Sequence, residues 1–135
     1  MTNIAYDQAQ WVLEAALSKA SEIGSPSSVA IVDAGRELVA FARQDGALLA
    51  SAEISIGKAY TSCSLQMATA DVGPLTQPGR PLYGLETSHQ RPLVTFAGGR
   101  PIQQGGEPAG AVGVAGGTVD QDDEIAMAAV AALGG

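Results

Sequence analysis

Residues 109–132 constrain the fold of this chain most, because they predict a strand, a tight turn and a helix in direct succession. Small and β-branched residues build the strand, and Gly116-Gly117 supplies the turn. Thr118 lies three residues before Gln121, which is the spacing of a capping box at a helix start. The acidic residues of the first turn suit the positive end of the helix dipole. The glycines favour either close strand–helix packing or the approach of a ligand to Gly116, Gly117 and Thr118.

Helical and strand patterns precede this stretch. Apolar residues spaced three and four apart predict one helix over residues 4–23 and a second over residues 47–68. Between them, residues 28–32 and 38–43 are two runs that predict a β-hairpin. We expect Gly35 in the positive-φ position of its turn.

The middle of the chain is rich in proline and glycine. Residues 70–91 predict a long irregular segment with one helical turn. Residues 92–97 predict a strand, Gly98-Gly99 a turn, and residues 100–103 the return strand. This order of elements favours a single α+β domain over residues 1–135, with a mainly antiparallel five-stranded sheet and helices packed on it.

Composition restricts the partners. A net charge of −7 argues against binding to nucleic acid or to an anionic membrane surface. Aromatic residues make up only 4% while alanine and glycine abound, so we expect close packing of small side chains and a homo-oligomer, a dimer or larger. Cys63 is the single cysteine, which excludes an internal disulfide and a multi-thiolate metal site. No signal-peptide pattern and no apolar run of ~20 residues is visible, which predicts a cytoplasmic protein.

Lys58 is the most conspicuous charged residue, because its neighbours Ile56 and Ala59 in the second predicted helix are apolar. One interpretation is a lysine whose ammonium group reaches solvent along an apolar surface. The other is a cation in a pocket, which binds a carboxylate or acts as a base once burial lowers its pKa. Arg43 and Asp45 flank the junction before this helix, and form either a surface pair or part of the same pocket.

The loop after this helix carries the remaining candidates. His89 is the only histidine, and is either a solvent-exposed residue, a proton carrier or an axial metal ligand. A lone histidine does not make a conventional zinc site. Glu86 follows Tyr83 closely, and the two form a candidate acid/base pair.

Six blocks of the sequence, in order along nearly its full length, resemble the GlcG/HbpS family. They are Ile-Val-Asp-Ala-Gly (31–35), Phe-Ala-Arg-Gln-Asp-Gly-Ala (41–47), Ile-Gly-Lys-Ala-Tyr-Thr (56–61), Pro-Leu-Tyr-Gly-Leu-Glu-Thr (81–87), Gly-Gly-Arg-Pro-Ile (98–102), and Gly-Ala-Val-Gly-Val-Ala-Gly-Gly-Thr (110–118) with Gln121-Asp122.

This resemblance implies a profilin-like α/β sandwich that forms dimers or larger assemblies. Members of the family include haem-binding extracellular sensors, a haem-binding domain attached to a cobalamin adenosyltransferase, and proteins encoded with glycolate or aromatic catabolism enzymes. Haem-binding relatives can use a histidine of the first helix as an iron ligand, and residues 4–23 contain none. Haem would then need His89, Tyr60, Tyr83, Met67 or a threonine oxygen as its ligand.

The resemblance therefore favours a small-molecule-binding protein, with haem or a related tetrapyrrole as the ligand. The alternative is a cofactor-free isomerase, hydratase or deaminase of a catabolic pathway. In that enzyme Lys58 and Arg43 hold a small organic acid while Glu86 or His89 moves a proton. A third hypothesis is an oligomeric assembly protein without a small ligand.

Overall fold

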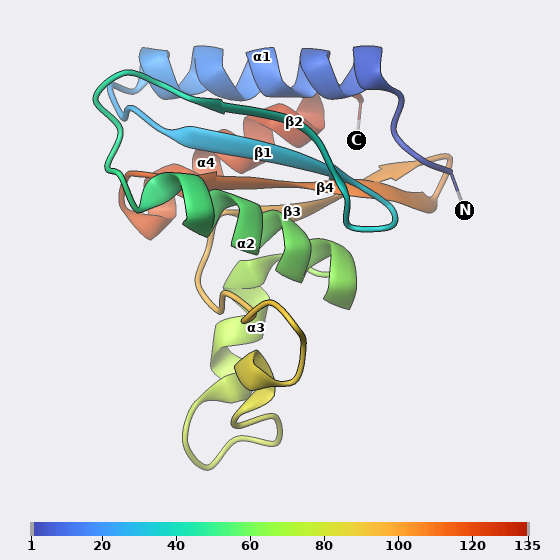
Figure 1. The fold of residues 1–135 in the computed structure, drawn as a ribbon, viewed down its shortest axis with the longest axis vertical. Helices are drawn as coiled ribbons and strands as arrows, with labels where there is room; N and C mark the ends of the chain where they lie inside the picture. The colour runs from blue at the N-terminus through green and yellow to red at the C-terminus, as the bar shows by residue number, and fades with distance from the viewer. Residues whose placement is uncertain (1, 135) are drawn as a thin grey trace.

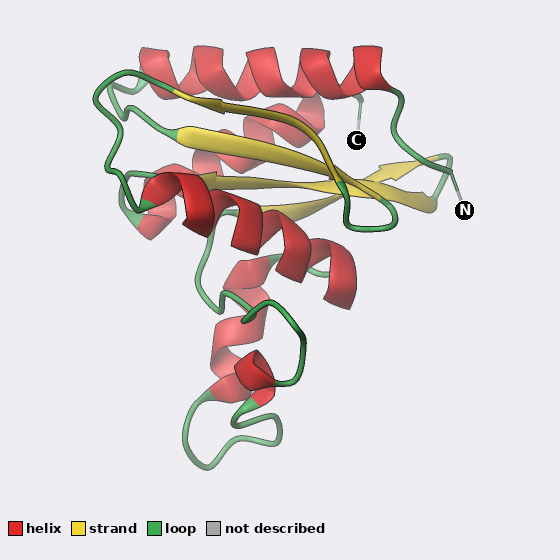
Figure 2. Ribbon diagram, in the orientation of Figure 1, coloured by secondary structure: helices red, strands yellow, loops and turns green. Residues whose placement is uncertain are grey.

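A four-stranded antiparallel sheet lies at the centre of the computed structural model, which describes residues 2–134 (Figures 1 and 2). The strands have the spatial order β2 (Leu38–Arg43), β1 (Ser28–Asp33), β4 (Glu107–Ala115) and β3 (Gly99–Gln104). The helices are α1 (Tyr6–Glu22), α2 (Ser51–Leu65), α3 (Thr69–Thr76) and α4 (Val119–Ala131), with a 3-10 turn η1 (Leu85–Thr87). The α+β prediction is confirmed.

Helices cover both faces of the sheet (Figure 1). Val29 and Ile31 of β1 pack with α1 and α4, while the alternate residues Ala30 and Val32 pack with α2. This alternation is the two-residue period of a strand. Because β1 is covered on both faces, its residues 28–32 are all buried.

Close contact between α2 and the sheet depends on glycine. A Cβ on Gly113 of β4 would collide with the carbonyl oxygen of Ser55 and lie 2.5 Å from the amide nitrogen of Ala59. Gly98, just before β3, has a φ of +127°, and a Cβ there would lie 2.6 Å from Nζ of Lys58. Side chains at these positions would push α2 off the sheet, so the glycines set the depth at which Lys58 is buried.

The sheet has four strands, so the prediction of five is wrong by one. The predicted strand over residues 92–97 is irregular backbone. Its N–H groups bond outside any strand ladder: Leu93 donates to the carbonyl of Glu86, and Val94 to Oγ1 of Thr61. Pro92 has no N–H to donate. The segment therefore packs on α2 and the preceding loop.

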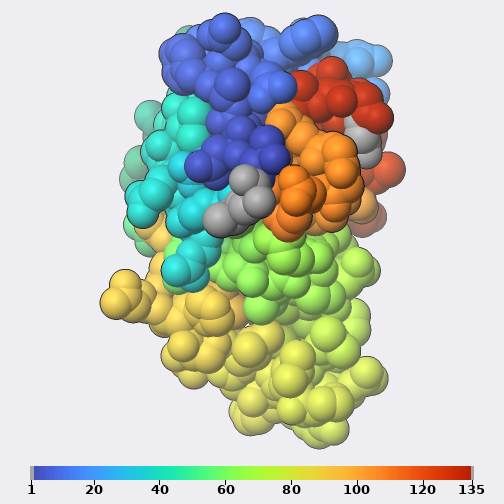
Figure 3. Space-filling model, turned by 90° about the vertical axis from the view of Figure 1, so that its right-hand side faces the viewer, coloured from blue at the N-terminus to red at the C-terminus, as the bar shows by residue number. Residues whose placement is uncertain are grey.

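The predicted irregular segment over residues 70–91 contains more helix than expected. It includes most of α3, in which Pro74 lies near the end, and η1. This part of the chain projects beyond α2, away from the sheet (Figures 1 and 3).

The β1–β2 turn differs from the prediction at one residue. Arg36, and not Gly35, has the positive φ, at 71°. Oδ1 of Asp33 accepts hydrogen bonds from the N–H groups of Gly35 and Glu37, which holds the turn in this shape. Among residues 2–134, no helix has the length and apolar character needed to cross a membrane.

Candidate functional site

Lys58 forms a buried ion pair with Asp122. The lysine is 1% exposed and the aspartate 3%. Nζ of Lys58 donates to Oδ2 of Asp122 at 3.0 Å and to the carbonyl oxygen of Val114 at 2.7 Å. The other carboxylate oxygen, Oδ1, accepts a hydrogen bond of 2.9 Å from the N–H of Gly117. The pair thus connects α2, β4, the glycine turn and α4.

Burial lowers the pKa of Lys58 below its ordinary value of 10.5, and the neighbouring carboxylate of Asp122 opposes this shift only in part. Nζ also lies 5.1 Å from the centre of the Phe96 ring, at cation–π distance. An ammonium group has three N–H donors, and the two hydrogen bonds to protein oxygens use two of them. The third donor has no hydrogen-bond acceptor among residues 2–134.

A cavity of about 120 Å³ lies beside this pair. We call it the Lys58 cavity. Its lining residues come from the segment before α2, from α2 itself, from the irregular segment 92–98, from the end of β4 with its glycine turn, and from the start of α4: Leu48, Ser51, Ile54, Lys58, Phe96, Ala115, Gly116, Gly117, Val119 and Asp122. Leu48, Phe96 and Val119 are also exposed on the outside, so an apolar rim leads to a charged interior.

Three of the predicted site residues, Lys58, Gly116 and Gly117, line this cavity together. Thr118 lies next to it, where its hydroxyl accepts a hydrogen bond from the N–H of Gln121 and caps α4 as the sequence predicts. The sequence analysis missed the role of Asp122, which it placed with the other acids of the first turn. Its spacing carried a signal, because Asp122 lies three residues before the apolar Ile125 and therefore on the buried face of the helix.

Tyr60 and His89, both half-buried, meet in a second cluster with two exposed arginines. Their rings lie edge to face with centres 6.1 Å apart. The guanidinium groups of Arg36 and Arg91 lie 4.8 and 5.8 Å from the centre of the Tyr60 ring. Nδ1 of His89 shares a hydrogen bond of 2.8 Å with the hydroxyl of Ser88. We call Tyr60, His89, Arg36 and Arg91 the Tyr60 cluster.

An open hollow of about 450 Å³ adjoins this cluster, lined by Tyr60, Gln90, Arg91 and Pro92. Tyr60 and His89 were predicted as site residues from the sequence, and neither arginine was. Arg36 reaches the cluster because its turn lies beside α2, where the guanidinium also donates to the hydroxyls of Tyr60 and Ser64. No sequence spacing indicates this contact.

The structure does not bring the other predicted residues to the Lys58 cavity. Arg43 is exposed at the end of β2. Asp45 lines a separate hollow of about 300 Å³ beside the end of α1. Tyr83 is 69% exposed in the projecting loop. Glu86 is half-buried, and its Oε1 is the one buried side-chain oxygen without a hydrogen-bond partner among residues 2–134.

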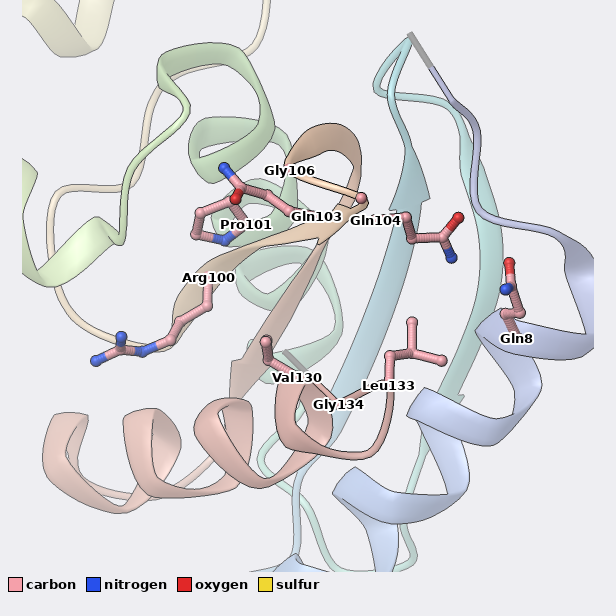
Figure 4. Close-up of a pocket in the computed structure, with 10 residues that line it drawn as sticks. Gln8, Arg100, Pro101, Gln103, Gln104, Gly106, Val130, Leu133 and Gly134 are labelled. Atoms are coloured by element: carbon pink, nitrogen blue, oxygen red, sulfur yellow. The ribbon is translucent and has the colours of Figure 1, made fainter.

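The largest hollow, of about 770 Å³, lies between β3, the end of α4 and α1 (Figure 4). Its lining contains amide, apolar and glycine residues, and one charged side chain, Arg100. In Figure 4, Arg100 extends away from Gln8 and Leu133. Its guanidinium forms a two-pronged ion pair with Asp123, with both distances at 2.8 Å. No predicted site residue lines this hollow.

Comparison with known proteins gives a consistent family. The family described as "Haem degrading protein HbpS-like" matches residues 4–131. A 15.0 kDa protein in the dhaT-dhaS intergenic region of Citrobacter freundii is 41% identical over 90% of this chain and 86% of its own length. The corrinoid adenosyltransferase PduO of Salmonella typhimurium is 42% identical over 88% of this chain, which spans only 35% of that longer protein.

A solved structure described as a PduOC:heme complex superposes with a TM-score of 0.92 at 36% identity. The match covers 97% of this chain and 95% of the other. The relative therefore shares the fold of this chain along nearly its whole length. This chain belongs to the HbpS-like family.

Proposed function

We propose that this protein binds a small molecule and that haem or a related tetrapyrrole is its ligand. The observation that carries the proposal is the 36% identity, over 97% of the chain, to a domain whose structure is a haem complex. The family description names haem as well.

The Tyr60 cluster supplies the side chains that haem requires. A haem iron takes an axial nitrogen or a tyrosine oxygen, and its carboxylate groups pair with arginine. His89 uses Nδ1 for Ser88, which leaves Nε2 for a metal. The phenol of Tyr60 lies beside it, and Arg36 and Arg91 supply two cations. When bound, haem would supply a coloured, redox-active iron centre, which these four residues would hold.

The other hollows fit haem less well. The Lys58 cavity, at about 120 Å³, is far below the ~300–1,000 Å³ typical of sites for drug-sized ligands. The hollow of about 770 Å³ is large enough, but its lining contains no histidine, tyrosine, cysteine or methionine. Two other candidate iron ligands lie outside the Tyr60 cluster. Tyr83 is exposed in the projecting loop, and Met67 is half-buried after α2.

The organic-acid enzyme of the alternative hypothesis requires its residues around one substrate. Of Lys58, Arg43, Glu86 and His89, only Lys58 lines the Lys58 cavity. That enzyme is therefore not part of the proposal. The hypothesis of a pure assembly protein expected no cavity near Lys58, and a cavity is present.

The proposal extends to the domain organisation, the oligomeric state and the cellular location of the protein. We propose that residues 1–135 form a single domain, which assembles into a homo-oligomer, since Tyr6 and Trp11 of α1 are 61% and 64% exposed. We also propose that the protein is cytoplasmic. Light scattering coupled to size-exclusion chromatography measures the oligomer, and cell fractionation measures the placement.

Hemin titration of the purified protein tests the ligand. We expect a shifted Soret band that saturates at a fixed ratio of hemin to protein chain. The absence of both a Soret shift and saturation would overturn the proposal. Hemin titrated into the same buffer without protein serves as the blank, because free hemin aggregates and changes its spectrum.

A further inference from the structure

We propose that the Lys58 cavity binds a small neutral carbonyl compound and that Nζ of Lys58 forms an iminium bond with it. This site is separate from the Tyr60 cluster and does not depend on haem binding. Its ligand class follows from the volume of the cavity, its charge and the chemistry of the lysine.

Volume limits the ligand to a few heavy atoms. The cavity holds about 120 Å³, with Leu48, Ile54, Phe96 and Val119 as its apolar wall. A short aliphatic chain suits this wall. An aromatic ring with a carbonyl substituent is too large for the space beside the pair.

Charge selects a neutral ligand. Lys58 and Asp122 cancel each other at the inner end of the cavity. Asp120 lies in the first turn of α4 and adds a negative charge that disfavours an anion, whereas Asp123 and Glu124 are paired with Arg100 and Lys19. The remaining N–H donor of Lys58 requires an acceptor, and a carbonyl oxygen is a neutral acceptor.

An adjacent empty space distinguishes this pair from a purely structural one. Buried ions are normally surrounded by packed atoms and complete hydrogen bonds, because a charge in low dielectric is costly. Here the aspartate uses both oxygens on protein donors, whereas the ammonium keeps one donor beside the cavity. The free N–H donor and the cavity are therefore both found at the ammonium group of Lys58.

The reaction conserves charge. The Lys58 ammonium transfers a proton to Asp122, and the neutral amine attacks the carbonyl carbon to form a carbinolamine. Asp122 returns the proton to the carbinolamine hydroxyl, the C–O bond breaks and water leaves. The product is an iminium that carries the single positive charge of the original ammonium, so the ion pair with Asp122 is retained. Burial, which lowers the pKa of Lys58, raises the fraction of neutral amine available for attack.

The chain offers an internal control, because Lys19 and Lys58 are its only two lysines. Lys19 lies on α1 with its side chain 26% exposed, at 3.5 Å from Glu22 and from Glu124. We would incubate the full chain with sodium cyanoborohydride and either acetaldehyde or benzaldehyde. Hydride reduces each iminium to a stable secondary amine, and peptide mass spectrometry measures labelling at each lysine.

Acetaldehyde is expected to label Lys58 faster than Lys19, because the lowered pKa of Lys58 leaves more of it as the neutral amine. Benzaldehyde is expected to label Lys19 in preference to Lys58, because it does not fit the cavity. Lys58 that stays unlabelled in the folded protein would overturn the proposal. So would equal labelling of Lys58 by both aldehydes, which indicates reaction through local unfolding.

Two matched variants test access to the cavity while Lys58 and Asp122 stay in place. Val119→Trp narrows the mouth of the cavity, and Met127→Trp places the same indole at an exposed residue of the same helix outside the cavity lining. Labelling of Lys58 by acetaldehyde is expected to fall severalfold in Val119→Trp and to stay unchanged in Met127→Trp. Equal rates in the two variants would contradict entry through this mouth. Haem binding by either variant is measured separately, so failure of this proposal is distinguishable from failure of the proposed function.

Discussion

The Lys58 cavity and the Tyr60 cluster both hold cations next to an aromatic ring, yet their surroundings differ. Lys58 is 1% exposed and has a carboxylate partner at 3.0 Å. Arg36 and Arg91 are exposed and lie against the Tyr60 ring, and Arg91 also lines the open hollow beside it. A buried charge contributes to stability through its partner, whereas an exposed charge contributes little to stability and is free to bind a ligand. Burial therefore assigns the two regions different roles.

The largest expected effect on stability comes from removing the carboxylate of the buried ion pair. Asp122→Ala leaves the Lys58 ammonium buried without its carboxylate, and is expected to lower the free energy of unfolding by about 3–5 kcal/mol. Asp123→Ala, at the next residue, removes the partner of the half-exposed Arg100 and is expected to cost about 1 kcal/mol. Urea denaturation measures both.

Equal losses in the two variants would contradict the expectation that a buried ion pair contributes more to stability than a half-exposed one. The double variant Lys58→Met with Asp122→Leu removes both charges, and is expected to recover most of the stability that Asp122→Ala loses.

The next largest effect concerns the exposed region. His89→Ala removes the proposed axial nitrogen and is expected to weaken hemin binding by at least about 100-fold, with a changed Soret maximum. Gln90→Ala, at the adjacent residue, which lines the hollow beside the Tyr60 cluster, is expected to leave the spectrum unchanged. Unchanged hemin affinity in His89→Ala, with saturable binding still present in the wild type, would place the haem elsewhere on the chain.

A smaller effect is expected from the arginines. Arg91→Gln removes one cation beside Tyr60 and is expected to weaken hemin binding about fivefold, since an exposed ion pair contributes up to ~1 kcal/mol. The loss should shrink as salt is added, because salt screens exposed charges. Arg80→Gln, at another exposed arginine of the projecting loop, is the control and should bind as the wild type does.

The smallest expected effect is a pH dependence that separates the two regions again. The folded-state pKa of Lys58 is lowered, so between that pKa and the unfolded value near 10.5 the unfolded state binds more protons. Stability must then rise with pH in this window. We expect wild type to gain stability relative to Lys58→Met as pH increases toward 10.5, and Arg36→Met to show no such trend against wild type.

Part of the site was predictable and part was not. The placement of Lys58 beside Gly116 and Gly117 follows from an apolar helix and a glycine turn, because such elements pack closely. The burial of Asp122 was not predicted, because acidic residues at the start of a helix are usually solvated and interact with the helix dipole. Its spacing from the apolar residues of the helix pointed to the buried face instead. The strand predicted over residues 92–97 was wrong because Thr61 and Glu86 accept its N–H groups in place of a neighbouring strand.

The sequence by itself determined the α+β class, the capped final helix and the elements that carry Lys58 and His89, because hydrophobic periodicity, turn residues and capping are local properties. Only the tertiary structure decided which side chains meet. Asp122 lies 64 residues from Lys58 in the chain, and Arg36 lies 24 residues from Tyr60. Such pairs depend on how closely α2 packs on the glycines of β4. This packing joins segments that are distant in the chain, so no local sequence pattern indicates it.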